Sequence, residues 1–105
     1  MNLITVAVSS SAGGDIAVIA AQGTTVSIRI HRICLSNGAA SAQAVIFKDG
    51  ATALTGALQL PSSIGGLFVL EGSPGNPLFT LSQNSAFNIN AVATLLTGFV
   101  QYSLG

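Results

Sequence analysis

Residues 26–35 read Val-Ser-Ile-Arg-Ile-His-Arg-Ile-Cys-Leu, and this stretch decides the fold. Apolar and polar residues alternate strictly in its first half, up to His31. Successive side chains of a β-strand point to opposite faces, so this alternation indicates a half-buried strand. Ile33 and Leu35 then take the opposite phase. A β-bulge near Arg32, or a strand buried on both faces at its end, would produce that slip.

The rest of the chain consists of similar short apolar segments separated by turn sequences. Asn37-Gly38 and Asp49-Gly50 tolerate a positive φ and favour tight hairpins. The predicted strands are residues 3–8, 15–21, 25–35, 42–48, 53–60, 66–71, 77–82, 86–92 and 97–104. Short strands at this spacing predict an all-β fold, an antiparallel β-sandwich or barrel. No linker is visible, so residues 1–105 are expected to form a single domain.

The chain carries very few charges. Charged residues make up 6% of it, against about 25% in an ordinary soluble domain. The fixed charges are Arg29, Arg32, Lys48, Asp15, Asp49 and Glu71. We therefore expect a surface of neutral polar and small residues, part of it covered by other copies of the chain or by a larger assembly. The net charge of zero argues against nucleic-acid partners, and no apolar run is long enough to predict a membrane span.

Few residues are suited to catalysis or metal binding. The chain has one histidine, His31, and no Gly-x-Ser-x-Gly sequence, which disfavours a Ser-His-Asp triad. His31 and Cys34 are too few for a structural zinc site. Asp15 and Asp49 look like isolated turn carboxylates and not the clustered oxygens of a calcium site. We expect no enzymatic activity, no cofactor and no metal.

One basic cluster, Arg29, His31 and Arg32, is the candidate interface. In strict alternation Arg29 and His31 share a face, and Arg32 points the other way. The cluster is either a set of solvated strand positions that discourage stray edge pairing, or a contact with a carboxylate or carbonyl of a neighbouring subunit. Lys48 is expected at a turn, where a solvated charge suffices.

The aromatic residues are expected in the core. The chain has one tyrosine and no tryptophan, so it offers few platforms for a sugar ring. The five phenylalanines lie inside predicted strands, which favours burial: Phe47, Phe68, Phe79, Phe87 and Phe99.

From Ile28 onward the chain resembles a small β-sandwich module of tailed-bacteriophage virion proteins. The resemblance rests on seven segments: Ile28 to Ile30, Asp49-Gly50, Thr52 to Gly56, Gly66 to Leu70, Pro74 to Phe79, Ala86 to Asn90, and Gly98 to Tyr102. It covers about three quarters of the chain. It implies a jelly-roll-like fold of about eight short strands and a structural role. The first 25 residues lie outside it, and residues 1–24 are expected to form an N-terminal arm or an added strand.

The function that the resemblance implies is that of a non-enzymatic virion protein. The leading hypothesis is a capsid decoration (cement) protein that forms a homotrimer, binds the major capsid protein and bridges its subunits. Such a protein is made in the host cytoplasm and resides on the capsid surface. A phage head or tail fibre, or a receptor-binding module, is the alternative from the same structural class. A carbohydrate-binding β-sandwich domain is the alternative from another class.

Overall fold

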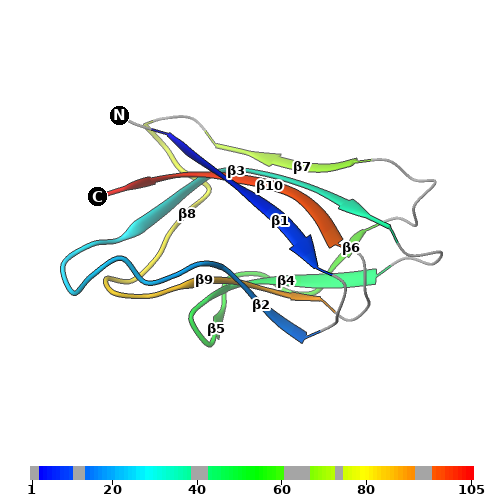
Figure 1. The fold of residues 1–105 in the computed structure, drawn as a ribbon, viewed down its shortest axis with the longest axis horizontal. Coiled ribbons are helices and arrows are strands. Elements are labelled where there is room, and N and C mark those ends of the chain that lie inside the picture. The colour runs from blue at the N-terminus through cyan, green and yellow to red at the C-terminus, as the bar shows by residue number, and fades with distance from the viewer. Residues whose placement is uncertain (1–2, 11–13, 39–42, 61–66, 73–74, 92–95) are drawn as a thin grey trace.

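Two antiparallel β-sheets pack face to face (Figure 1). The computed structural model describes residues 3–10, 14–38, 43–60, 67–72, 75–91 and 96–105. Within these ranges every regular element is a strand, and they contain no helix able to cross a membrane. The prediction of an all-β antiparallel sandwich is confirmed.

Within the described residues, sheet A contains five strands and is built around the two longest. Its order is β1 (Ile4–Ser10), β10 (Leu96–Leu104), β3 (Ile28–Asn37) and β7 (Leu67–Glu71), and β8 (Phe79–Thr80) also pairs with β3. Nine residues of β10 pair with β3, so these two strands form the backbone of the sheet.

Sheet B also contains five strands in the ranges that the structure describes. Its order is β2 (Gly14–Ile19), β9 (Phe87–Ala91), β4 (Gln43–Asp49) and β5 (Thr52–Ala53), and β6 (Leu58–Leu60) also pairs with β4. Strands β5 and β6 occupy successive parts of one edge of β4, as β7 and β8 do on β3. When each of these pairs is counted as one interrupted strand, eight strands remain, in the order of a jelly roll.

The core lies between the two sheets and includes an aromatic centre. The ring of Phe47, which is fully buried, has its centroid 6.1 Å from that of Phe87, 6.3 Å from that of Phe79 and 6.4 Å from that of Phe68. Other fully buried side chains from both sheets surround this cluster: Ile28, Ile30, Ile33, Leu35, Leu60, Ile89, Leu96, Val45 and Val100. Phe99 is an exception to the expected burial, since it is only half-buried and is not part of this core.

The predicted bulge in β3 is confirmed and falls at His31. Arg32 pairs with Gln101, whereas the next residue of β10, Tyr102, pairs with Ile30. The extra residue reverses the alternation, so that Ile30 and Ile33 both point into the core. The end of the strand is also buried on both faces, because Cys34 is 8% exposed.

The predicted strand boundaries differ most from the structure in three places. The single strand expected at 53–60 is two short strands, β5 and β6, with residues 54–57 outside both. The strand expected at 77–82 contains only Phe79–Thr80, and the strand expected from residue 25 begins at Ile28. Apolar residues in the excluded segments still pack on the core, as Leu54 and Leu78 do, so their hydrophobicity gave no sign that the ladder stops.

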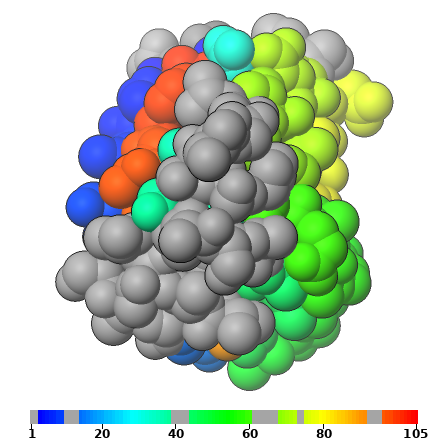
Figure 2. Space-filling model, turned by 90° about the vertical axis from the view of Figure 1, so that its right-hand side faces the viewer, coloured from blue at the N-terminus to red at the C-terminus, as the bar shows by residue number. Residues whose placement is uncertain are grey.

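The N-terminal segment supplies one edge strand to each sheet. Strand β1 pairs along its whole length with β10, and β2 pairs with β9. In the space-filling view of Figure 2 the blue atoms of β1 form one margin of the molecule, beside the orange atoms of β10.

Candidate functional site

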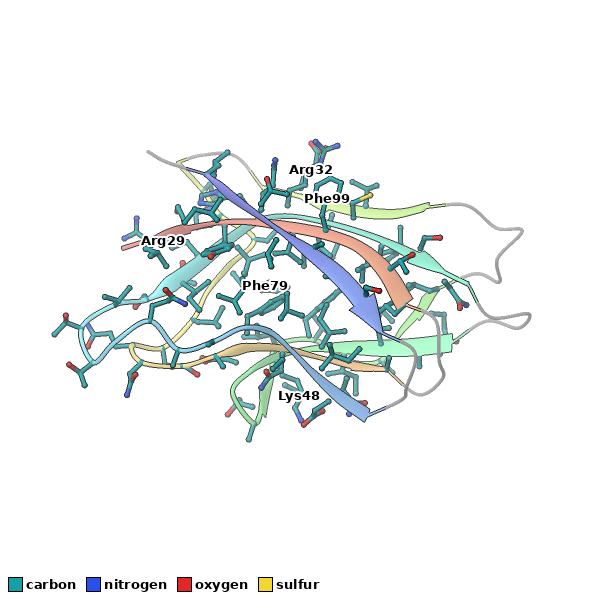
Figure 3. All side chains as sticks on the ribbon, in the orientation of Figure 1. Arg29, Arg32, Lys48, Phe79 and Phe99 are labelled. Carbon is teal, nitrogen blue, oxygen red and sulfur yellow. The ribbon has the colours of Figure 1, made fainter. Side chains whose placement is uncertain are left out.

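The bulge places the whole basic cluster away from the core. The two residues that flank the cluster, Ile28 and Ile33, are fully buried in the core, whereas Arg29 is exposed and Arg32 is half-buried. The prediction that Arg32 points opposite to Arg29 and His31 is wrong, because strict alternation does not hold across a bulge. Figure 3 shows Arg32 and Phe99 above sheet A, on the side away from sheet B.

Arg32 finds its carboxylate within its own chain. Its Nη2 lies 3.0 Å from Oε1 of Glu71, the residue opposite it on β7. Its guanidinium carbon lies 5.9 Å from the centroid of the Phe99 ring. Phe99 lies outside the core because its neighbour in β10, Val100, points into it. The two charged side chains are 43% and 57% exposed, so water screens the ion pair and it stabilises the fold by at most about 1 kcal/mol.

His31 is buried beside a serine. It is 3% exposed, and its Nε2 lies 2.7 Å from the hydroxyl oxygen of Ser103, which is also 3% exposed. Its other ring nitrogen, Nδ1, has no hydrogen-bond partner among the described residues. No carboxylate of the described residues orients this histidine as in a catalytic triad, and the serine beside it is buried.

A shallow pocket of about 180 Å³ lies over the bulge. Its lining residues are Leu3, His31, Arg32, Glu71, Gly72 and Gln101. The chain leaves sheet A here: the Gly72 amide donates to the His31 carbonyl at 2.7 Å, and the Leu78 amide donates to the Ile30 carbonyl at 2.8 Å. Arg32 Nε, like His31 Nδ1, is buried without a partner in the described part of the chain. Both nitrogens are closed to solvent, so the polar groups that the pocket presents are the exposed parts of Arg32 and Glu71.

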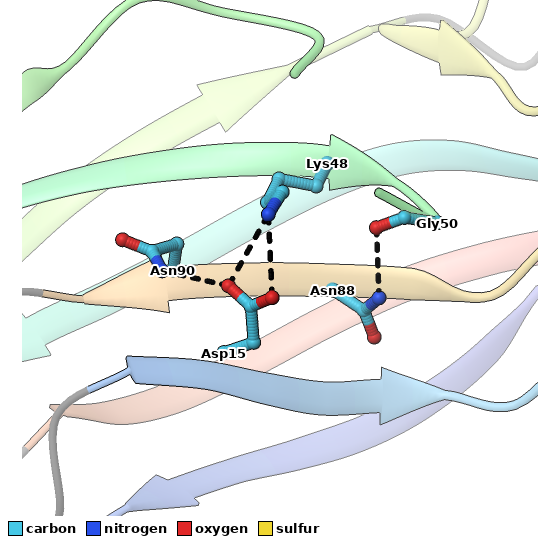
Figure 4. Close-up of polar contacts among 5 residues, drawn as sticks. All are labelled: Asp15, Lys48, Gly50, Asn88 and Asn90. Atoms are coloured by element: carbon cyan, nitrogen blue, oxygen red, sulfur yellow. Dashed lines mark hydrogen bonds and ion pairs between the residues drawn. The ribbon is translucent and has the colours of Figure 1, made fainter. Parts of the chain in front are cut away.

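Sheet B carries a second polar cluster, on its outer face (Figure 4). The Lys48 ammonium lies 3.2 Å from Oδ2 of Asp15, and the Asn90 amide donates to Oδ1 of Asp15 at 2.6 Å. This network joins β4, β9 and β2. The Asn90 hydrogen bond, followed by that from Lys48, lowers the pKa of Asp15.

Two predictions about this cluster are wrong. Lys48 is not a solvated turn residue, because its side chain is 18% exposed and paired, and Asp15 is not an isolated turn carboxylate. Both lie in strands. Val45 and Phe47 point into the core, so the alternation of the strand puts the next residue, Lys48, on the outer face. The residues around Lys48 gave no sign that β2 would bring Asp15 beside it.

Asp49, the last residue of β4, anchors the segment that follows β8 through hydrogen bonds with Ser82. One of its carboxylate oxygens accepts hydrogen bonds from the Ser82 amide and the Ser82 hydroxyl, each at 3.0 Å. Partial burial by itself would raise the pKa of Asp49, but hydrogen bonds from Ser85 and Ser82 outweigh it and lower the pKa.

The lowered pKa of Asp49 predicts a loss of stability in acid. A carboxyl group whose pKa is lower in the folded chain than its ordinary 3.8 stabilises the fold above that value. The free energy of unfolding should decrease as the pH falls below about 3.8 and through the folded-state pKa. Urea titrations between neutral and acidic pH measure this. Asp49→Asn should make the decrease shallower, and Ser82→Ala should do so in part. An Asn variant with the full wild-type pH dependence would contradict the assignment.

The described residues contain no group of three or more His, Cys, Asp and Glu side chains placed to hold a metal ion. Cys34 is a free, buried thiol. Comparison with protein-family models, with curated proteins and with solved structures found no match to this chain.

Proposed function

We propose that this chain is a non-enzymatic structural protein of a phage virion. It acts as a capsid decoration protein that forms a homo-oligomer, a trimer by preference, and bridges subunits of the major capsid protein. One observation carries the proposal: in a jelly roll with almost no charge, Arg29 and Arg32 lie on one strand and on the outer face of sheet A, where Arg32 and Glu71 line a pocket. The resemblance of residues 28–105 to virion modules supports the same function.

The proposed mechanism is mechanical. Arg32 already pairs with Glu71, so this ion pair presents both a donor and an acceptor to a neighbouring subunit. Arg29 is exposed and makes no ion pair with any described residue, which leaves its guanidinium available to a carboxylate or carbonyl of the capsid. A guanidinium can make two parallel hydrogen bonds to a carboxylate. Contacts of this kind across a seam add buried area and resist separation of the subunits.

The pocket over the bulge favours carbohydrate binding as a second candidate function. Arg32, Glu71 and Gln101 offer hydrogen-bond donors and acceptors for sugar hydroxyls, and Leu3 offers an apolar wall. The ring of Phe99 lies beneath the Arg32 guanidinium and does not present a free platform. A glycan array with the purified protein distinguishes this function from decoration.

Loss of either arginine should weaken docking on the capsid. Arg29→Ala and Arg32→Ala should each reduce co-sedimentation with expanded capsids at least tenfold, because a partner's carboxylate would lose its counter-charge. Thermal stability of the free protein should change little, since both side chains are exposed or half-exposed. Lys48→Ala is the control: it removes the same charge from the opposite sheet and should leave docking unchanged.

If all three substitutions have equal and negligible effects on docking, the basic cluster is an ordinary solvated surface. Failure of the wild-type protein to bind capsids, together with binding to host cells or glycans, would favour the fibre or the carbohydrate function.

A further inference from the structure

The two sheets have four edges, and an unpaired edge is a template for another strand. Strand β1 lies at one end of sheet A, with β7 and β8 at the other; β2 lies at one end of sheet B, with β5 and β6 at the other. An edge exposes a row of backbone N–H and C=O groups. Soluble proteins protect such rows with charges, bulges or very short strands.

Three of the four edges carry such protection. Strand β7 has five residues and ends in Glu71, and β8 has two. Strands β5 and β6 have two and three residues. Strand β2 carries Asp15, and its pairing with β9 shifts register between Ala17 and Ile19.

The edge of β1 has none of these features. Its seven residues, Ile-Thr-Val-Ala-Val-Ser-Ser, contain no charge, proline or glycine. It pairs with β10 without a register shift, and no other described strand pairs with it. Figure 1 shows β1 in front of β10 and β3, nearest the viewer. At its start Leu3 and Ile4 are 47% and 39% exposed, so the edge also offers apolar surface.

We propose that β1 pairs antiparallel with β1 of a second copy of this chain, around a twofold axis at Ala7. In that register Val6 lies opposite Val8 of the second copy, and Thr5 lies opposite Ser9 of the second copy. The axis pairs odd-numbered residues of one copy with odd-numbered residues of the other. Side chains that face the core in one copy therefore lie beside side chains that face the core in the other. Valine pairs and hydroxyl pairs are favourable across antiparallel strands.

A second copy fits this edge better than a charged partner does. The edge has no charged side chain with which to select an acidic or basic strand, and pairing with itself brings no like charges together. A twofold contact uses the same patch on both chains. It requires an even number of chains: two, or six where it joins two of the trimers proposed above. The inference does not rest on the capsid function.

A single lysine in the middle of the edge tests the contact. Ala7→Lys places two ammonium groups opposite each other on the twofold axis, and Ala7 is exposed, so the folded chain accommodates the substitution. Light scattering should show the mass of the assembly halved. Ala17→Lys is the matched control, since Ala17 is an exposed alanine of the protected edge strand β2. The assembly of this variant should have the same mass as that of the wild type.

Disulfide trapping provides the second measurement. Opposed Cα atoms in antiparallel strands lie about 4.5–5.5 Å apart, within the range that a disulfide spans. Ala7→Cys, in a Cys34→Ala background, should form a covalent dimer on mild oxidation, and Ala17→Cys should not. A monomeric wild type, an unchanged mass for Ala7→Lys, or no cross-link would overturn the edge contact. If the edge contact is overturned but Ala7→Lys still binds capsids, the proposed decoration function is unaffected.

Discussion

Phe47→Ala should lower the free energy of unfolding by about 3–5 kcal/mol, the usual cost of deleting a buried aromatic side chain. The ring is fully buried, and three other phenylalanine rings lie within 6.4 Å of its centroid. These rings come from β7, β8 and β9, whereas Phe47 lies on β4, so the cavity would open between the two sheets. Urea denaturation followed by circular dichroism measures the change.

Phe99→Ala is the matched control for this substitution. Phe99 is half-buried on the outer face of sheet A, beneath Arg32, and takes no part in the aromatic cluster. Its loss should cost about 1 kcal/mol, because it removes one exposed cation–π contact and partial burial. Equal costs for the two substitutions would contradict the assignment of Phe47 to the centre of the core.

Gly98→Ala should prevent folding or cost more than about 4 kcal/mol, a range reached only by a few severe mechanisms. Gly98 has φ +149°, and a Cβ there would overlap the carbonyl oxygen of Cys34 and lie 2.9 Å from the Leu35 Cα. Both obstacles are backbone atoms of β3, which pairs with β10 at this point. The clash is relieved only if the two longest strands separate. Yield of soluble protein and urea denaturation measure the effect.

Gly14→Ala separates backbone strain from collision. Gly14 also has a positive φ, +101°, but a Cβ there meets nothing within 4 Å. Its substitution should cost only about 1–3 kcal/mol, the typical cost of a strained backbone conformation. A Gly98 variant that is no less stable than the Gly14 variant would show that β10 and β3 are less closely paired than described.

The fold class was predictable because a strand leaves a local pattern in the sequence. The alternation in residues 26–35 placed β3, and its slip placed the bulge to within one residue of Arg32. The limits of β8 and the gap between β5 and β6 were not predictable. They depend on where β3 and β4 have unpaired edge positions, and the residues of β5, β6 and β8 themselves do not indicate those positions.

The candidate site was predictable only in part. Residues Arg29, His31 and Arg32 are adjacent in sequence, so their clustering was visible, but their common face was not, because the bulge changes the direction of the side chains. The partners Glu71 and Ser103 lie far away in the chain and are brought in by β7 and β10. The same holds for Asp15 and Lys48, which are 33 residues apart.

The most direct test of the proposed function is the heat resistance of the capsid itself. Expanded capsids of the phage that, under this proposal, encodes the chain are mixed with the purified protein, freed of unbound chain by sedimentation, and heated while light scattering or cryo-electron microscopy follows their rupture. We predict that the protein sediments with the capsids in a fixed ratio and raises their rupture temperature. Capsids that neither retain the protein nor gain heat resistance would contradict the account.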